Sequence, residues 1–337
     1  MSNVYGIDIG TSNFKMCCKD KVLNEKNIIA IANKNELLAF GDEAYEMYEK
    51  APENIEVSFP VKFGVIADIE NMQTLLLSFF NKINDDKKNS GNNDFYIAVP
   101  TDVTEVEKRA FYELVAESKV KAKNIFIVDK PVADAIGAGL DVTKSRGIMV
   151  VNIGAETTEI SVLSLGGIVI SKSVKIGGNK LDDGIISSVR RVYNLVIGSK
   201  TAESLKKELG SAVKTEESFA PGFGRNVLSG LPVSVDISSD VIHSAIIDPL
   251  HSIMDAIKVI LERTPPELAA DIIKNGIYVS GGTSQINNLE EFIKEETNLN
   301  VNIVENPSES VVRGLIGVVS NPEFSKIPYT PQDKKYD

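Results

Sequence analysis

Hydrophobic and polar residues along this chain follow two alternating periods, and the same order of periods occurs twice. Short apolar runs of strand length alternate with longer runs that have apolar residues at helical spacing. In the first half we expect strands at 4–9, 14–19, 28–32, 95–99 and 125–128, and helices at 72–83 and 104–118. In the second half we expect strands at 149–153, 159–164, 168–174 and 276–280, and helices at 181–196, 202–209 and 240–262. Each half therefore predicts an α/β unit that opens with three strands.

Local signals mark the ends of several elements. Thr104 precedes Glu107 by three residues, which is the spacing of a capping box at a helix start. Pro131 follows a predicted strand and stands where proline favours the first turn of a helix. Segment 212–231 is interrupted by proline and glycine, so we expect irregular structure there. Segment 321–337 contains three prolines and little periodicity, so we expect a flexible tail.

The composition is that of a soluble globular protein. A length of 337 residues suggests about two domains, and 43% apolar and 25% charged residues are ordinary values. A net charge of −11 disfavours a general binder of the nucleic-acid backbone, so we expect no nucleic-acid partner. The adjacent Cys17 and Cys18 point to opposite faces of a strand, which favours reduced thiols in a cytoplasmic protein over a disulfide.

A sharp glycine turn after an apolar strand occurs twice. The first copy is Asp8-Ile9-Gly10-Thr11-Ser12-Asn13. The second copy is Asn152-Ile153-Gly154-Ala155-Glu156-Thr157, in which Asn152 lies 144 positions after Asp8. In a duplicated fold such turns face one another, and their backbone N–H groups can hold the phosphates of a nucleotide.

Ordered motifs across 4–318 make the chain resemble MreB, the bacterial cell-shape actin. They are GIDIGTSN at 6–13, GVIAD at 64–68, AIGAG at 135–139, SLGG at 164–167, IGG at 176–178, YNL at 193–195, GLP at 230–232 and TPPELAAD at 264–271. One glycine-rich turn would be weak evidence, but this ordered set covers nearly the whole chain.

The resemblance implies an α/β fold of the actin-like ATPase type. Two duplicated βββαβα-type halves would surround a nucleotide cleft, each with a small inserted subdomain. We place the first half at 1–143, with its inserted subdomain at about 30–68. The second half would be 144–320, with its inserted subdomain at about 180–238, followed by the tail at 321–337.

The resemblance also implies ATP or ADP, with Mg²⁺, bound in the cleft. The matching positions are Asp8, Gly10, Thr11, Ser12, Asn13, Lys15, Asn152, Gly154, Ala155, Glu156, Thr157, Glu203, Lys206, Gly281, Gly282 and Thr283. Among them, Asp8 matches the carboxylate that orients magnesium through water, a role that suits a hard cation which keeps its waters. Glu203 and Lys206 match the positions that flank the nucleoside.

Departures from the family pattern concern the chemistry of hydrolysis. Lys130 stands where MreB has the glutamate that positions or activates the attacking water, and a charged lysine offers only donors. Asn152 replaces a metal-orienting aspartate, and Glu156 replaces a glycine beside the phosphates. Thr283 also replaces a glycine, in a third phosphate-site turn, Gly281-Gly282-Thr283. These changes predict weak nucleotide binding or none, and little or no ATPase activity, with no confident catalytic residue.

Two alternatives stay open at this stage. Lys15 is apolar in MreB but is a lysine near the terminal phosphates in actin, so it either faces phosphate or points from its strand to solvent. The departures are also open to compensation, for example if Lys130 neutralises Glu156 or stands in for metal charge at a phosphate.

The resemblance implies self-association into filaments that organise cell shape and cell-wall synthesis. A regular MreB and cell-wall elongation proteins are the expected partners. The loop at 84–93 contains no apolar residue, so it offers no support for direct membrane insertion, and membrane association would come through partners. The alternatives to a filament protein with weakened hydrolysis are a working ATP-dependent ATPase and a non-polymerising regulator.

Overall fold

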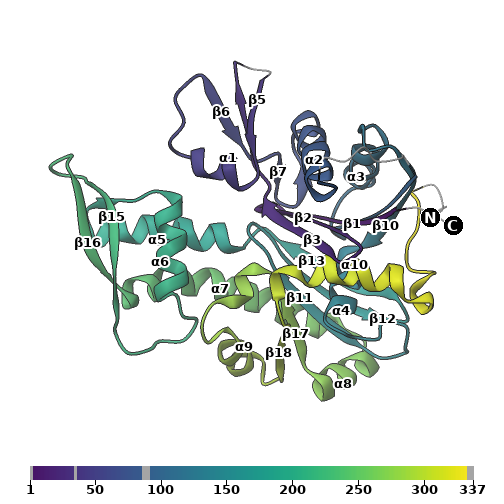
Figure 1. Cartoon of the computed structure of the whole chain (residues 1–337). Coiled ribbons are helices and arrows are strands. Elements are labelled where there is room, and N and C mark those ends of the chain that lie inside the picture. The colour runs from purple at the N-terminus through teal and green to yellow at the C-terminus, as the bar shows by residue number, and fades with distance from the viewer. Residues whose placement is uncertain (1–2, 34–35, 86–91, 332–337) are drawn as a thin grey trace.

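The computed structural model shows two larger and three smaller β-sheets joined by helices. It describes residues 3–33, 36–85 and 92–331 (Figure 1). The larger sheets have five strands each, and the smaller ones have three, three and two.

The first large sheet is built from the N-terminal half, in the order β10-β9-β1-β2-β3. Its strands are β1 (Asn3–Ile9), β2 (Asn13–Cys18), β3 (Lys21–Lys26), β9 (Asn93–Val99) and β10 (Ala122–Asp129). The central β1 pairs antiparallel with β2 and parallel with β9. One face of the sheet is covered by α2 (Ile69–Ile83) and α3 (Glu105–Ala116). The predicted capping box is confirmed, because Thr104 Oγ1 accepts from Glu107 N–H and Glu107 accepts from Thr104 N–H.

The second large sheet repeats this order as β18-β17-β11-β12-β13. Its strands are β11 (Ile148–Ile153), β12 (Thr158–Ser164), β13 (Gly167–Val174), β17 (Ile277–Ser280) and β18 (Val301–Ile303). Here β11 takes the place of β1, antiparallel to β12 and parallel to β17. The accompanying helices are α7 (Ser239–Arg263), α8 (Pro266–Asn275) and α9 (Leu289–Thr297).

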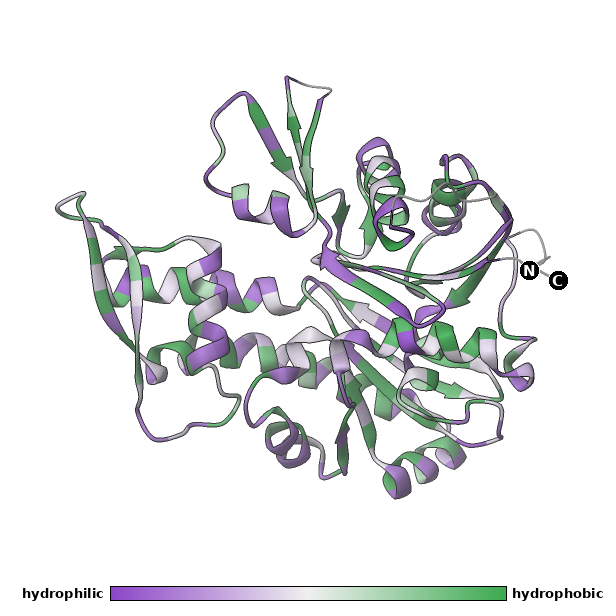
Figure 2. Cartoon of the chain, in the orientation of Figure 1, coloured by the Kyte–Doolittle hydropathy of each residue, from purple (hydrophilic) through white to green (hydrophobic). Residues whose placement is uncertain are grey.

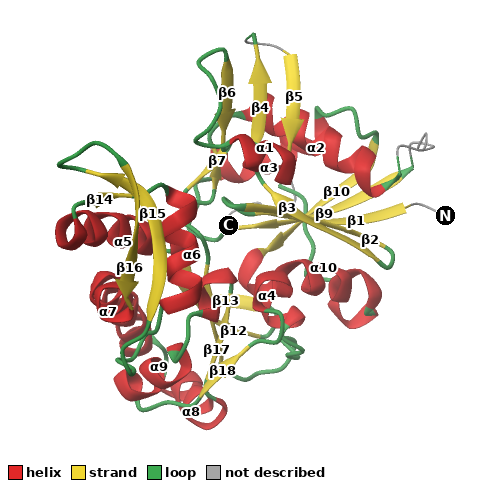
Figure 3. Ribbon diagram, turned by 60° about the vertical axis from the view of Figure 1, so that its left-hand side comes forward, coloured by secondary structure: helices red, strands yellow, loops and turns green. Residues whose placement is uncertain are grey.

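Each large sheet carries a smaller unit on the same side of the molecule (Figures 1 and 3). The first unit contains β4 (Ile29–Ala32), β5 (Glu36–Phe40), β6 (Ile55–Ser58) and α1 (Asp42–Met47). The second contains α5 (Gly178–Tyr193), β14 (Leu195–Val196), α6 (Ser199–Leu209), β15 (Phe219–Asn226) and β16 (Pro232–Ser238). A short hairpin of β7 (Val61–Lys62) and β8 (Val65–Ile66) returns the chain from the first unit to α2.

Two helices lie between the large sheets, α4 (Lys130–Gly137) and α10 (Ser310–Ser320). They cross at two glycines, Gly137 and Gly314. A Cβ atom on Gly137 would lie 1.8 Å from the carbonyl oxygen of Ser310, and one on Gly314 would lie 1.6 Å from that of Ala133. Figure 2 shows α10 to be largely hydrophobic, as expected for a helix packed between sheets. Backbone contact at this crossing joins the two halves.

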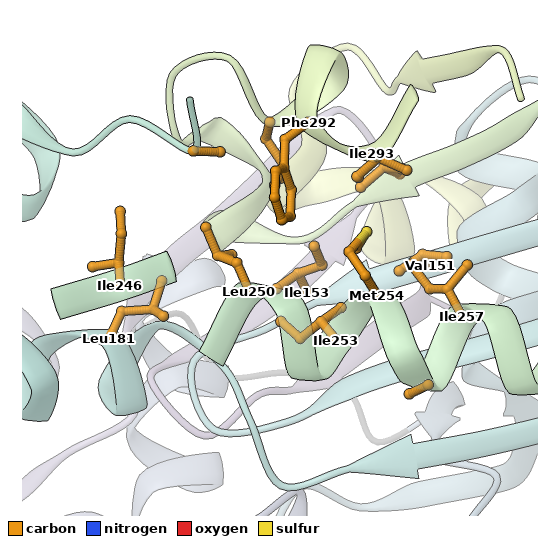
Figure 4. Packing of buried hydrophobic residues seen from close by; sticks show 14 of the residues in the cluster. Val151, Ile153, Leu181, Ile246, Leu250, Ile253, Met254, Ile257, Phe292 and Ile293 are labelled. Carbon is orange, nitrogen blue, oxygen red and sulfur yellow. The ribbon is translucent and has the colours of Figure 1, made fainter. Parts of the chain in front are cut away.

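The largest hydrophobic core lies in the second half. Figure 4 shows Leu250, Ile253, Met254 and Ile257 of α7 directed at the sheet that contains Val151 and Ile153. These four helical residues recur at the three- and four-residue spacing that the sequence pattern predicts for one buried face. The packing fixes β11, and with β11 the position of the glycine turn that follows it.

Three elements differ from the sequence-based expectations. The third strand of the first sheet is β3, whereas the strand expected at 28–32 is β4 of the smaller unit, because β3 is a polar edge strand with no apolar alternation. Residues of β15 form a strand despite Pro221, which lies where β15 pairs only with β16. Part of the expected flexible tail is anchored, since Tyr329 exchanges backbone hydrogen bonds with Ile127.

Candidate functional site

A cleft of about 1180 Å³ separates the two halves. Every site position expected from the sequence lines it, and so does Lys130. The first glycine turn follows β1, the central strand of the first large sheet, and the other two follow β11 and β17, which are neighbours in the second. The structure therefore brings together residues that are up to about 270 positions apart in the chain.

The first two turns have the same backbone geometry. Gly10 N–H donates to the carbonyl of Asn13 at 3.0 Å, and Gly154 N–H donates to that of Thr157 at 2.8 Å. A Cβ on Gly10 would lie 2.7 Å from its turn's carbonyl oxygen, against 3.0 Å on Gly154. The internal repeat in the sequence therefore corresponds to two turns with the same backbone hydrogen bond.

Asp8 is the centre of a buried cluster of charge. Its Oδ2 atom lies 3.2 Å from Lys15 Nζ, which donates a hydrogen bond to it. Its Oδ1 atom lies 3.2 Å from Lys130 Nζ without hydrogen-bond geometry, so this contact is an ion pair. Burial alone would raise the pKa of Asp8, but Lys130 and Lys15 outweigh it and lower the pKa to about 2.

The structure answers two of the questions that the sequence leaves open about the two lysines. Lys15 is buried and faces the cleft, so the solvent-facing alternative is wrong. Lys130 pairs with Asp8, not with Glu156. Burial would lower the pKa of Lys130, but Asp8 and Glu159 raise it above its usual value. Lys130 therefore stays a cation near neutral pH.

The second turn carries no such cluster. Asn152 donates its side-chain amide to Asp134 Oδ2 at 2.9 Å and to Ser280 Oγ at 3.0 Å. Ser280 in turn donates to the same Asp134 oxygen. Asp134 is fully buried on α4, and burial raises its pKa. Sequence reasoning missed this acid; the available signal was a lone aspartate inside an apolar, alanine-rich helix.

Glu159 is a second buried acid that sequence reasoning missed. It pairs across β11 and β12 with Asn152, as Lys15 pairs with Asp8. Its Oε1 atom accepts from the backbone N–H of Thr101 at 2.8 Å and from its hydroxyl at 2.5 Å. Burial raises its pKa. The signal was the 144-residue repeat, which places Glu159 at the counterpart of Lys15.

The β7–β8 hairpin closes over both turns. Gly64 N–H donates to Thr11 Oγ1 of the first turn at 3.3 Å. Phe63 N–H donates to Glu156 Oε2 of the second turn at 2.6 Å. Glu156, expected to oppose phosphate, is thus engaged with the hairpin backbone. It links the two halves across the cleft.

The third turn is tied to the second. Thr283, which stands in place of a glycine in the family pattern, donates its hydroxyl to the carbonyl of Gly154 at 2.7 Å. Its side chain therefore spans two turns that are far apart in sequence.

At the outer end of the cleft, α1 and the residues just after it contact α6. Tyr45 OH donates to Glu203 at 3.1 Å, and Glu49 accepts from the backbone N–H of Ser199 at 3.2 Å. Lys206 pairs with Asp182 at 2.8 Å. Burial raises the pKa of Asp182 to about 6, because Lys206 offsets the burial only in part.

The residues around Asp8 do not fit a hydrated Mg²⁺ ion in this arrangement. Both carboxylate oxygens already face ammonium groups, and the amide of Asn152 brings no charge. A dication here would meet both ammonium groups, and a pair of like unit charges 4 Å apart costs about 4 kcal/mol at an effective dielectric constant of 20. Within the described residues, no three His, Cys, Asp or Glu side chains are grouped to hold a metal.

Two sheets of the same strand order, joined by crossed helices and facing a cleft with paired glycine turns, define the actin-like fold. Comparison with known proteins confirms this fold class. The chain matches the model of the MreB/Mbl protein family over residues 2–326, and it belongs to that family.

Relatives match over nearly their full length. The chain is 38% identical over 329 residues to the cell shape-determining protein Mbl of Bacillus subtilis, covering 96% of this chain and 97% of that one. It is 38% identical over 321 residues to the cell shape-determining protein MreB of Escherichia coli, covering 93% and 92%.

Solved structures agree with this assignment. MreB5 of Spiroplasma citri, with structures bound to ADP and to AMPPNP, is similar with a TM-score of 0.89 and 35% identity, covering 94% of this chain and 96% of that one. The MamK double helical filament gives a TM-score of 0.79 at 22% identity, covering 95% and 99%, and supports the fold alone.

Membrane contact is not tested by the described residues. None of their helices combines the length and the apolar character needed to cross a bilayer. The polar loop expected at 84–93 falls largely on 86–91, which lie outside the described residues.

Proposed function

We propose that this protein is a filament-forming subunit of an MreB-like cytoskeleton that helps to set cell shape and to organise cell-wall synthesis. Membership of the MreB/Mbl family and full-length similarity to cell shape-determining proteins support the proposal. The protein would work in the cytoplasm, self-associate alone or with a regular MreB, and reach the membrane through partners.

In this proposal the cleft binds ATP or ADP. The two matching turns, the third turn beside them and the charged residues at the outer end support binding. The similar MreB5 of Spiroplasma citri holds ADP and AMPPNP. The phosphates would lie against the turns, which are lined by backbone N–H groups and by Thr11 and Ser12.

Hydrolysis by this subunit is slow or absent. The observation that carries this part is the ion pair of Lys130 with Asp8 at 3.2 Å. A charged lysine cannot take a proton from an attacking water, and this lysine is held in its charged form by Asp8 and Glu159. Attack on a phosphate also needs positive charge that offsets the developing negative charge. Lys130 can supply that charge, but it cannot act as the base.

Two measurements test the proposal together. Sedimentation with ATP, with ADP and without nucleotide reports filament formation, and a phosphate-release assay on the same samples reports hydrolysis. We expect pelleting at high protein concentration with phosphate release near background. Strictly monomeric behaviour under all conditions would overturn the filament role, and steady release at the rate of a regular MreB would overturn the slow-hydrolysis part.

A second candidate function is a working ATPase that uses Glu159 as the proton acceptor. The carboxylate of Glu159 lines the cleft, and its raised pKa suits a general base. A Glu159→Gln variant separates the two functions. Release that is measurable in the parent and lost in this variant favours the second candidate, whereas release near background in both favours the first.

A further inference from the structure

The charge around Asp8 is unusual for a site that accepts an anion with its metal. Two ammonium groups face one carboxylate, all three side chains are largely buried, and all line the cleft. Lys15, Asp8 and Lys130 together carry one net positive charge, and the nearby Glu159 and Asp134 also interact with the charge of Lys130.

The cluster lies beside the phosphate turns. Lys15 pairs in register with Asp8, which is two residues before Gly10 of the first turn. Lys130 is the first residue of α4, and it contacts the other oxygen of the same carboxylate. The two ammonium groups therefore meet at Asp8, where a bound cation would otherwise neutralise the charge of a polyphosphate.

The second half adds nothing that would draw a metal to this place. Asn152 is neutral and donates to Asp134 and Ser280. The nearby acids are already engaged, Glu159 with Thr101 and Glu156 with Phe63. Lys15 and Lys130 line the cleft, and both contact Asp8 there.

We propose that this cleft binds a nucleoside di- or triphosphate without a divalent metal, with Lys15 and Lys130 supplying the positive charge at the phosphates. The inference rests on the nucleotide binding of the proposed function. Phosphate oxygens and Asp8 share the two ammonium groups, so the ligand is held by charge-assisted hydrogen bonds in place of metal bridges.

Equilibrium binding of ATP and ADP to the full chain, in excess Mg²⁺ and in EDTA, tests the proposal. Because excess Mg²⁺ complexes most of the nucleotide, we expect binding in EDTA to be as tight as in Mg²⁺ or tighter. Binding that weakens tenfold or more in EDTA would overturn the metal-free site and leave nucleotide binding intact. Absence of binding in both conditions would overturn nucleotide binding as well.

Variants of Lys130 add a second test. Lys130→Met keeps the length of the side chain and removes its charge, so affinity in EDTA should fall about tenfold or more. Lys130→Arg keeps the charge and should bind within about threefold of the parent in EDTA. Lys274→Met, at an exposed lysine of α8 that does not line the cleft, is the matched control. Melting curves show whether each variant is folded. If Lys130→Met is folded and binds in EDTA as the parent does, the proposed role of Lys130 is wrong.

Discussion

The two glycine turns of this protein have the same backbone hydrogen bond but differ in the charge of the residues around them. Each follows the central strand of a five-stranded sheet and is closed by the same hydrogen bond. The first turn is preceded by Asp8, which contacts two lysines. The second is preceded by Asn152, which donates a hydrogen bond to Asp134. A duplicated fold can therefore keep the shape of a phosphate site in both halves while concentrating the positive charge in one.

The strand partners show the same contrast. Lys15 and Glu159 are equivalent in register, opposite in charge and both buried. Lys15 is directed to Asp8 and the cleft, whereas Glu159 is held by Thr101. The two equivalent positions thus carry opposite charges and contact different partners. Variants at the two turns should therefore differ in their effect on stability.

Removing the charge of Asp8 should have the largest effect. Asp8→Asn leaves two buried ammonium groups without their counter-charge, so we expect the free energy of unfolding to fall by about 3 kcal/mol. Urea unfolding measures the change. Asp183→Asn, at an exposed aspartate on the cleft wall, should stay within about 0.5 kcal/mol of the parent. A loss below about 1 kcal/mol for Asp8→Asn would show that the cluster is not a structural ion pair.

Adding charge at the second turn should cost less. Asn152→Asp places a carboxylate against Asp134, now 2.9 Å from the amide nitrogen, and we expect a loss of about 2 kcal/mol by urea unfolding. The exchange Asn152→Asp with Asp134→Asn restores one acid and one amide, so it should recover more than half of that loss. Equal losses for the single and the double variant would contradict the proposed repulsion.

The two turns should also differ in their tolerance of a methyl group. A Cβ on Gly10 meets a backbone oxygen at 2.7 Å, against 3.0 Å on Gly154. We expect Gly10→Ala to lower the free energy of unfolding by about 2 kcal/mol and Gly154→Ala by about 1 kcal/mol. Each variant serves as the other's control. The reverse order would mean that the second turn is the tighter one.

Acid should stabilise the outer end of the cleft. The pKa of Asp182 is raised to about 6 in the folded state from 3.8, so the folded state takes up a proton as pH falls through 6. Relative to Asp182→Asn, the parent should gain about 1.4 kcal/mol of unfolding free energy between pH 7 and pH 5. Urea unfolding at the two pH values measures the gain. A parent that loses stability relative to the variant over this window would show that the pKa of Asp182 is not raised.

Much of this fold and site could be predicted from sequence because the signals are local. Thr104 and Glu107 form the predicted cap, and the glycine turns lie on one cleft. The strand β3 escaped prediction because an exposed edge strand needs no apolar alternation.

The contacts inside the site escaped prediction because they join distant positions. The pairing of Lys130 with Asp8, and of Asn152 with Asp134, depends on how α4 meets both sheets. Periodicity within a segment carries no record of such contacts. Sequence alone showed that Lys130 departs from the family pattern, but only the structure shows which charge it meets.

Phosphate release in a single turnover with Mg²⁺, compared between the parent and a restored variant, tests the central claim most directly. The restored variant carries Lys130→Glu, Asn152→Asp and Glu156→Gly, together with Asp134→Ala, which removes the acid that would repel the new aspartate. We predict release near background in the parent and at least about tenfold faster release in the folded variant, since residues that act as a unit must be restored together. A parent that already hydrolyses ATP at a rate the four changes do not raise would contradict the account.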